Sequence, residues 1–302
     1  MSSRIRLVPF LVIGALALAV ASFLGGSVGA MIGGHKPLWI LAVSPPSLHV
    51  PPEHPFASIP ISNTMLSAWL AIVVIIGVFF LGTRRMSLVP GVLQNALEYV
   101  CEIVGGFIEE MVGKEHERRM FPLIMTVFLF VAVNAWLALL PGFETITHND
   151  HSILRSANTD INVPLMLAMV CVVMIEYWGF RARGFAYLKS FFDLHHLVRA
   201  AKSLRHGYLR DSLVNLFYGC IYFFVGILEL LGHAVRVLSF SFRLFGNMTA
   251  GVVLTTVALF LVPLVLPSVF YGLEALFGLV QAVVFAGLTA VFGYAAISSA
   301  EH

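Results

Sequence analysis

Charged residues are scarce in this chain of 302 residues. They make up 11% of the sequence against 59% hydrophobic residues, and the mean hydropathy is +0.92. A soluble domain carries about 25% charged residues. The apolar residues form runs of about 20, long enough for helices that cross a bilayer, whereas a transmembrane barrel has short alternating strands. The sequence therefore predicts an all-α integral membrane protein.

Cysteine and the signatures of catalysis are also missing or rare. The three cysteines, Cys101, Cys171 and Cys220, lie far apart without a C-x-x-C pair, and an odd number suits no disulfide framework. The net charge of +2 is too small to indicate nucleic acid as a partner. The sequence shows no nucleotide-binding loop, no paired nucleophile and base, and no metal signature. We therefore expect no enzymatic reaction, no cofactor and no bound metal in this chain.

The chain divides into three parts. Residues 1–34 hold an apolar run behind Arg4 and Arg6, which is either a retained membrane helix or a signal peptide with small residues at 27–30. The run is long for a signal peptide, which favours the retained helix. Residues 35–60 form an external segment too rich in proline for a helix. Residues 61–302 form the membrane domain.

Histidines and acidic residues gather in two external loops. They lie in the proline-rich segment, at His35, His49 and His54, and in the loop 143–162. Such residues could ligate a metal, but their irregular spacing favours solvated loop side chains.

About five to six membrane helices are expected, the last two of them long and tilted. After the N-terminal run they cover residues 63–81, 121–140, 163–180, 213–266 and 269–298. The segment 213–266 far exceeds the roughly 20 residues needed to cross a bilayer, so it is tilted, bent or split. Residues 90–119 are amphipathic and charged, a pattern typical of a helix on the membrane surface.

Basic residues fall at alternate ends of the expected spans, at Arg84 and Arg85 and again at Arg181 and Arg183. Because positive residues stay on the cytoplasmic side, this pattern places the C-terminus in the cytoplasm. The basic stretch continues to residue 210 and suits anionic lipid or an acidic partner protein.

One arginine, Arg243, interrupts the longest apolar segment, within SFSFRLFGNMTAG. An arginine at bilayer depth costs roughly 2.5–3.5 kcal/mol and usually faces a protein partner or a water-filled cavity. On a helix, Ser239 and Asn247 fall within about 40° of Arg243, and Arg236 and Glu229 continue that face. Snorkelling to a headgroup is a poor alternative because apolar residues flank the arginine on both sides.

Polar residues are placed on both sides of this arginine. Glu274 and Gln281 share one stripe of the last helix, about 10 Å apart, and with Asn247 they can line a water-filled inlet. Glu229 and His233 can line a second one. Arginine stays cationic and cannot relay a proton, so it blocks a direct leak between the two inlets. The pattern indicates directed ion movement; a salt bridge that only joins helices is the alternative for Glu274.

The motif RLFGNM-x-AG, an apolar terminal helix with a lone glutamine, and the ending AEH together resemble subunit a of the F-type ATP synthase. Weaker agreement extends from about residue 61 to the C-terminus and includes PGVLQ at 90–94 and SANTDIN at 156–162. The resemblance implies that Arg243 faces a c-subunit ring across two aqueous half-channels. The candidate residues for proton translocation are then Arg243, Glu274, Gln281, Asn247, Glu229, Ser239 and His233.

The resemblance also implies partners and location: the c-subunit ring, the b-subunit peripheral stalk and the rest of the complex, in a bacterial inner membrane. The chain departs from the family at position 252, in a longer basic stretch before Asp211, and in lacking the proline that commonly precedes the RLFGN arginine. The acid or histidine often found nine residues after the arginine is Val252 here. In the family a second ionisable group often stands seven residues before the terminal-helix glutamine, and here that residue is Glu274. Glu274 is therefore expected to carry more of the inlet function alone.

Other functions are compatible with an arginine inside a membrane span. An independent secondary anion transporter could bind its substrate through Arg243, but such transporters show internal repeats and broken helices, and neither is evident in the sequence. A membrane hydrolase needs a nucleophile and a base. The choice between protons and sodium stays open because it depends on the ring's carboxylate site.

Overall fold

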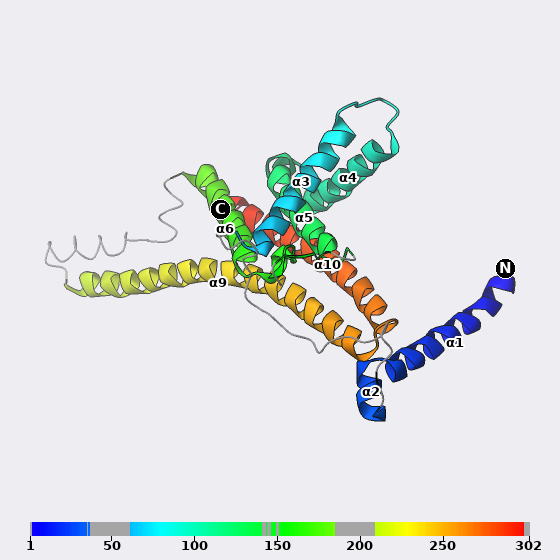
Figure 1. Cartoon of the computed structure of the whole chain (residues 1–302). Coiled ribbons are helices and arrows are strands. Elements are labelled where there is room, and N and C mark those ends of the chain that lie inside the picture. Colours follow the sequence, from blue (N-terminus) through cyan, green and yellow to red (C-terminus); the bar gives the residue numbers. More distant parts are fainter. Residues whose placement is uncertain are drawn as a thin grey trace. The chain divides into compact units, whose positions relative to one another are not determined.

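The computed structural model describes residues 2–34, 36, 61–140, 143, 146–148, 151–184 and 209–298 (Figure 1). Its helices are α1 (Ser2–Gly25), α2 (Ser27–Gly33), α3 (Asn63–Thr83), α4 (Val92–Val112), α5 (Lys114–Ala138), α6 (Asn162–Arg183), α9 (Leu209–Leu261) and α10 (Leu266–Ser298). A two-stranded antiparallel hairpin, β1 (Thr147–His148) with β2 (His151–Ser152), and the 3-10 helix η1 (Ala157–Thr159) lie between α5 and α6. The all-helical architecture is confirmed.

The number of spans also agrees with the prediction. Five helices are long and apolar enough to cross a membrane: α3, α5, α6, α9 and α10. A sixth span is possible if α1 and α2, which meet at a 60° bend, count as one broken span. Most of the proline-rich segment 35–60, with its three histidines, and residues 185–208 of the basic stretch lie outside the described residues.

The N-terminal run is two helices rather than one, separated at Gly26. Ser22 lies fully buried in the last turn but one of α1, and its Oγ accepts a hydrogen bond of 3.3 Å from the backbone N–H of Leu264. A Cβ added at Gly26 would come 3.4 Å from the Pro263 ring. The bend therefore rests on the connection between α9 and α10.

The amphipathic stretch 90–119 is divided at Gly113, which adopts a left-handed φ of 78° that favours glycine. Before it, α4 buries Val104, Ile108 and Val112 at a spacing of four residues, so this helix has the apolar stripe that the sequence predicted. Beyond it, the charged residues 114–119 form the first turns of α5 rather than the end of a surface helix. Its first turn carries two acidic residues, which the helix dipole stabilises there.

The segment 213–266 is neither split nor broken. It forms α9, one helix of 53 residues, which ends just before Pro263 because the residue preceding a proline is disfavoured in a helix. At 1.5 Å per residue α9 is about 80 Å long, well over the roughly 30 Å of hydrocarbon in a bilayer. It therefore crosses strongly tilted or extends beyond the hydrocarbon layer.

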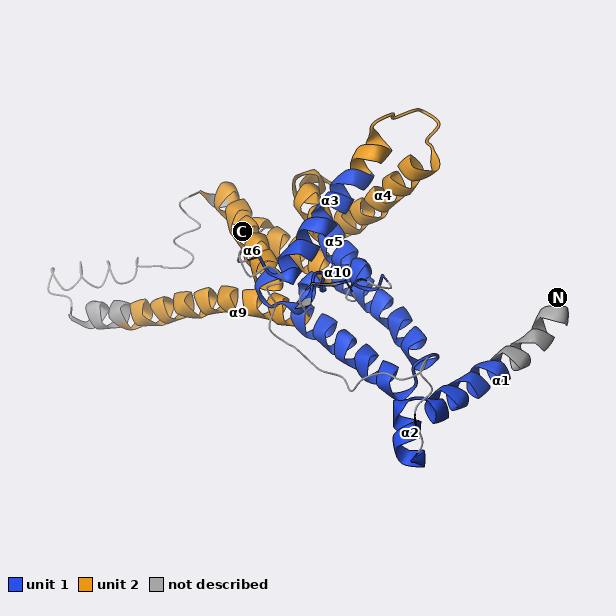
Figure 2. Ribbon diagram, viewed as in Figure 1, with its two compact units in different colours: residues 1–78, 129–163, 244–282 blue, residues 79–128, 164–243, 283–302 orange. Residues whose placement is uncertain are grey.

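The chain forms two compact units, each assembled from separated stretches (Figure 2). Unit 1 comprises residues 1–78, 129–163 and 244–282, and unit 2 comprises residues 79–128, 164–243 and 283–302. In unit 1, Gly278 of α10 lies so close to α5 that an added Cβ would come 2.6 Å from the Cβ of Ala135. In unit 2, Gly293 of α10 lies against Trp178 of α6 in the same way, at 2.9 Å. Glycines thus set the closest helix contacts in both units.

A buried polar cluster in unit 1 ties the start of α3 to the segment before α6. Thr64 Oγ1 donates a hydrogen bond of 2.8 Å to Asp160 Oδ2, and both residues are buried. Asp160 Oδ1 accepts from the backbone N–H of Asn162 at 3.1 Å and so caps the first turn of α6. Ser67 Oγ accepts from the backbone N–H of Arg155 at 3.1 Å. The loop 143–162, predicted to carry solvated side chains, is buried at its end, where it joins α3 to α6.

Candidate functional site

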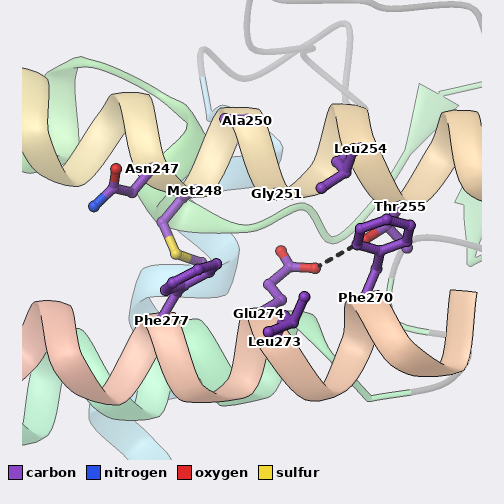
Figure 3. A pocket seen from close by; sticks show the side chains of 10 residues that line it. All are labelled: Asn247, Met248, Ala250, Gly251, Leu254, Thr255, Phe270, Leu273, Glu274 and Phe277. Atoms are coloured by element: carbon purple, nitrogen blue, oxygen red, sulfur yellow. Dashed lines mark hydrogen bonds between the residues drawn. The ribbon is translucent and has the colours of Figure 1, made fainter.

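A pocket of about 230 Å³ lies between α9 and α10 in unit 1, around Glu274 (Figure 3). It is lined by Asn247, Met248, Ala250, Gly251, Leu254 and Thr255 of α9 and by Phe270, Leu273, Glu274 and Phe277 of α10. Glu274 projects from α10 toward α9, and its Oε2 accepts a hydrogen bond of 3.3 Å from Thr255 Oγ1. Its side chain is only 7% exposed. Among the ten lining residues it is the one ionisable side chain, as expected from the sequence.

Gly251 allows the carboxylate to approach α9. A Cβ at this position would lie 3.0 Å from Glu274 Oε1 and 3.1 Å from its carboxyl carbon, closer than most real Cβ contacts. Val252, nine residues after Arg243, does not line the pocket. The close neighbours of Glu274 on α9 are thus a glycine and a hydroxyl group, Gly251 and Thr255.

A second polar contact joins the same two helices. Asn247 Nδ2 donates a hydrogen bond of 2.8 Å to Gln281 Oε1. Gln281 is 3% exposed, and its Nε2 has no hydrogen-bond partner among the described residues. Two of the predicted inlet residues, Asn247 and Gln281, are therefore in direct contact, and a buried amide donor stays available beside them.

Arg243 lies on the exposed face of α9. Phe240, Leu244 and Met248 are buried at a spacing of four residues, whereas Arg243 and Ser239 are exposed. Within the part of the chain that the structure describes, no hydrogen bond or ion pair engages the Arg243 guanidinium. An arginine inside an apolar span is costly unless a partner or water meets it. Among the described residues, nothing offsets that cost.

A third polar group forms in unit 2, around His233 of α9. His233 Nδ1 lies 2.5 Å from Oε1 of Glu176, which belongs to α6. Arg236 Nη1 lies 3.5 Å from the same Nδ1, and the guanidinium carbon lies 4.1 Å from the ring centroid of Phe292 of α10. A guanidinium over an aromatic face is held by a cation–π interaction. The structure thus joins α6, α9 and α10 through one carboxylate, one imidazole and one guanidinium.

Glu229 lies one turn before His233 on α9 and is half-buried. It makes no hydrogen bond or ion pair with any other residue in the described ranges. The acid that meets His233 is Glu176 instead. The sequence does carry a signal for Glu176, since it is a lone acid in the apolar run 163–180, but nothing in that run shows which residue it faces.

None of the three polar groups resembles a metal centre. Among the described residues, no group of three or more histidine, cysteine, aspartate or glutamate side chains is placed to hold a metal ion. The three cysteines are unpaired, with Cys171 buried, Cys101 half-buried and Cys220 exposed.

The fold and these side chains define a polytopic helical membrane protein with ionisable groups along its spans, the class in which ion pathways are found. Residues 65–293 match the family model described as ATP synthase A chain. The chain is also 33% identical over 230 residues to ATP synthase subunit a of Gloeobacter violaceus, an alignment that covers 76% of this chain and 81% of that relative. The chain belongs to the ATP synthase A chain family.

Proposed function

We propose that this chain is the proton-conducting stator subunit of an F-type ATP synthase and that Arg243 separates its two half-channels. The observation that supports this best is the exposed guanidinium of Arg243, which no described residue of the chain engages. A fixed cation attracts a carboxylate and lowers its pKa. A ring carboxylate that moves past Arg243 therefore loses its proton there, and it takes up a new one only after moving on.

The inlet in this proposal is the pocket around Glu274. Glu274 is an ionisable group in an otherwise uncharged lining, so it can accept a proton from water and deliver it toward the ring. Asn247 and Gln281 lie beside it and present amide groups along the same pair of helices. The unpartnered Nε2 of Gln281 is a donor that an approaching carboxylate can use.

The outlet lies on the part of α9 that precedes Arg243. His233 and Glu229 belong to it, and Ser239 stands between them and the arginine on an exposed position. The basic ends of the spans orient this part of α9 toward the cytoplasm, which also places the C-terminus inside. Protons thus enter beside Glu274 and leave near His233.

The proposed partners follow from the role. The c-subunit ring supplies the moving carboxylates, the b-subunit peripheral stalk holds the chain still, and the rest of the complex carries out ATP chemistry, so this subunit is not itself catalytic. The compartment is a bacterial inner membrane. A chain acting alone as an anion transporter would not co-purify with a ring of small proteins attached to an ATPase.

The test uses the Arg243→Ala complex in sealed vesicles. ATP-driven acidification and passive proton leak under an imposed potential are recorded separately, after subunit content has been verified. We expect pumping to be lost and the leak to rise. Arg181→Ala, which removes another exposed arginine in the last turns of α6, serves as the control and keeps pumping. Normal pumping by Arg243→Ala would overturn the stator role.

A further inference from the structure

Glu176 of α6 and His233 of α9 lie close enough to share a proton. The Oε1–Nδ1 separation is 2.5 Å, shorter than an ordinary hydrogen bond between neutral groups. One proton lies between these two atoms. It belongs either to the carboxyl group of Glu176 or to the imidazole of His233.

Arg236 makes these two arrangements distinguishable. A guanidinium only donates hydrogen bonds, so its contact of 3.5 Å with His233 Nδ1 requires a lone pair on that nitrogen. A protonated Glu176 would compete with Arg236 for that single lone pair. When the proton moves to Nδ1, the N–H donates to the Glu176 carboxylate, and Arg236 keeps its place over the Phe292 ring. The proton changes atoms while the pair keeps the same number of protons.

Both side chains are partly exposed at the surface of the chain, although Oε1 of Glu176 is itself buried. The His233 side chain is 17% exposed and the Glu176 side chain is 30% exposed. A pair that served only to join α6 to α9 could be replaced by well-packed apolar side chains at no cost in stability. In the proposal below, protons reach and leave the pair through the exposed parts of the two side chains.

The pair lies between Arg243 and the cytoplasmic ends of its helices. Glu176 stands seven residues before Arg183, the last residue of α6, and His233 stands ten residues before Arg243 on α9. At 1.5 Å per residue that places His233 about 15 Å from the arginine along the helix axis. This is the outlet side of the proposed pathway.

We propose that Glu176 and His233 form a proton-exchange station on the outlet, in which Glu176 is the required second member. The proposal rests on the proposed function. Glu176 first releases its proton to cytoplasmic water, and a proton released near Arg243 then reaches His233 and passes from Nδ1 to the vacated carboxylate. The groups around the pair are Arg236, one turn after His233, Glu229, one turn before it, Tyr177 next to Glu176, and the Phe292 ring.

The test measures ATP-driven proton uptake by the whole complex in sealed inverted vesicles between pH 6 and pH 9. Glu176→Gln and His233→Gln are compared with the double variant and with Tyr177→Phe, a matched control at the neighbouring position of α6. A positioned acid or base contributes 10²-fold or more to proton transfer in enzymes, so we expect each single variant to lose at least about tenfold in rate at neutral pH. We also expect a changed pH profile. The double variant should lose no more than the worse single one, since the pair acts as a unit.

Each remaining outcome has a fixed meaning. Single variants that pump like Tyr177→Phe overturn the station. A lower rate with an unchanged pH profile also overturns it, because a merely structural pair would give that result. If a single variant fails to assemble, the double variant, which leaves no charge unpaired, decides instead, and its failure to assemble shows a structural role. Arg243→Ala is measured in parallel, so that normal pumping there signals failure of the proposed function itself.

Discussion

The side-chain amide of Asn247 donates to the side-chain oxygen of Gln281 over 2.8 Å, which links α9 to α10 one helical turn after Arg243. Because Gln281 is almost fully buried, this contact fixes the orientation of its amide and leaves Nε2 free of partners among the described residues. Asn247 therefore holds the side-chain amide of Gln281 in position.

Removing one member of this contact should cost more than removing both. Asn247→Ala leaves the buried Gln281 oxygen unpaired, which costs about 1–3 kcal/mol, whereas Asn247→Leu combined with Gln281→Leu leaves no orphaned group. We expect the heat-inactivation midpoint of the purified complex to fall most in Asn247→Ala. Thr256→Ala is the control, since its hydroxyl bonds only the backbone of its own helix. Strictly additive losses in the double variant would contradict a direct coupling.

Glu274→Gln tests the ionisable group of the pocket with little change in volume. The amide oxygen can still accept from Thr255, so assembly should be preserved. Proton uptake and release are lost, and we expect proton-driven ATP synthesis to fall by at least about tenfold. Glu274→Asp keeps the charge and should retain more activity. Equal synthesis by Glu274→Gln and the unsubstituted complex would remove Glu274 from the inlet.

Gly251→Val tests the open space beside Glu274. The added side chain begins 3.0 Å from Glu274 Oε1, so it enters the pocket and displaces the carboxylate. We expect slower proton uptake with normal subunit content, measured in the same vesicles. Gly77→Ala is the matched control because nothing lies within 4 Å of a Cβ at that glycine of α3. An unaffected rate in Gly251→Val would mean that protons do not pass this point.

Asp160→Ala tests the buried joint at the start of α6. It removes the helix cap and the acceptor of the Thr64 hydroxyl together, at a cost of about 1–3 kcal/mol. The heat-inactivation midpoint should drop by several degrees. Asp160→Asn retains one oxygen acceptor and should lose less. Identical midpoints for the two variants and the unsubstituted chain would show that the joint contributes no stability.

Gly26→Val tests the docking of the N-terminal helices. Its side chain would meet the backbone oxygen of Ser22 and the Pro263 ring, so α1 and α2 should separate from the connection between α9 and α10. Limited proteolysis of the detergent-solubilised complex should then release an N-terminal fragment sooner than in the unsubstituted protein. Gly14→Ala, with open space around its Cβ, is the control. A chain whose mature form starts beyond residue 30 would give the same digest for all three proteins.

The membrane spans were predictable because a run of about 20 apolar residues is what a helix needs to cross a bilayer. The residues at which the helices end were harder to predict. Nothing in the composition of residues 90–119 distinguishes the end of α4 from the start of α5, which depends on the single left-handed residue Gly113. For α9, the sequence left a tilted, bent or split helix open, and the structure has one helix from Leu209 to Leu261. Local patterns fix the existence of helices better than their boundaries.

The polar residues of the candidate site were predictable from the sequence, but the contacts between them were not. Arg243, Glu274 and Gln281 stand out because polar groups are costly in apolar spans. Their neighbours come from other helices, and no periodicity reports them: Glu176 opposite His233 and Thr255 opposite Glu274 emerge only from the fold. Asn134, a buried amide within α5, donates to the backbone oxygen of Phe130 in its own helix.

The unbroken course of α9 gives this subunit a mechanical property as well as a chemical one. It is one helix from Leu209 to Leu261, and it contributes residues to both compact units. Long helices yield by gentle curvature rather than by folding at one point. Arg243 is the last residue of α9 in unit 2, and Leu244 is the first in unit 1. In the proposed role, a force on Arg243 therefore acts on a helix that is part of both units.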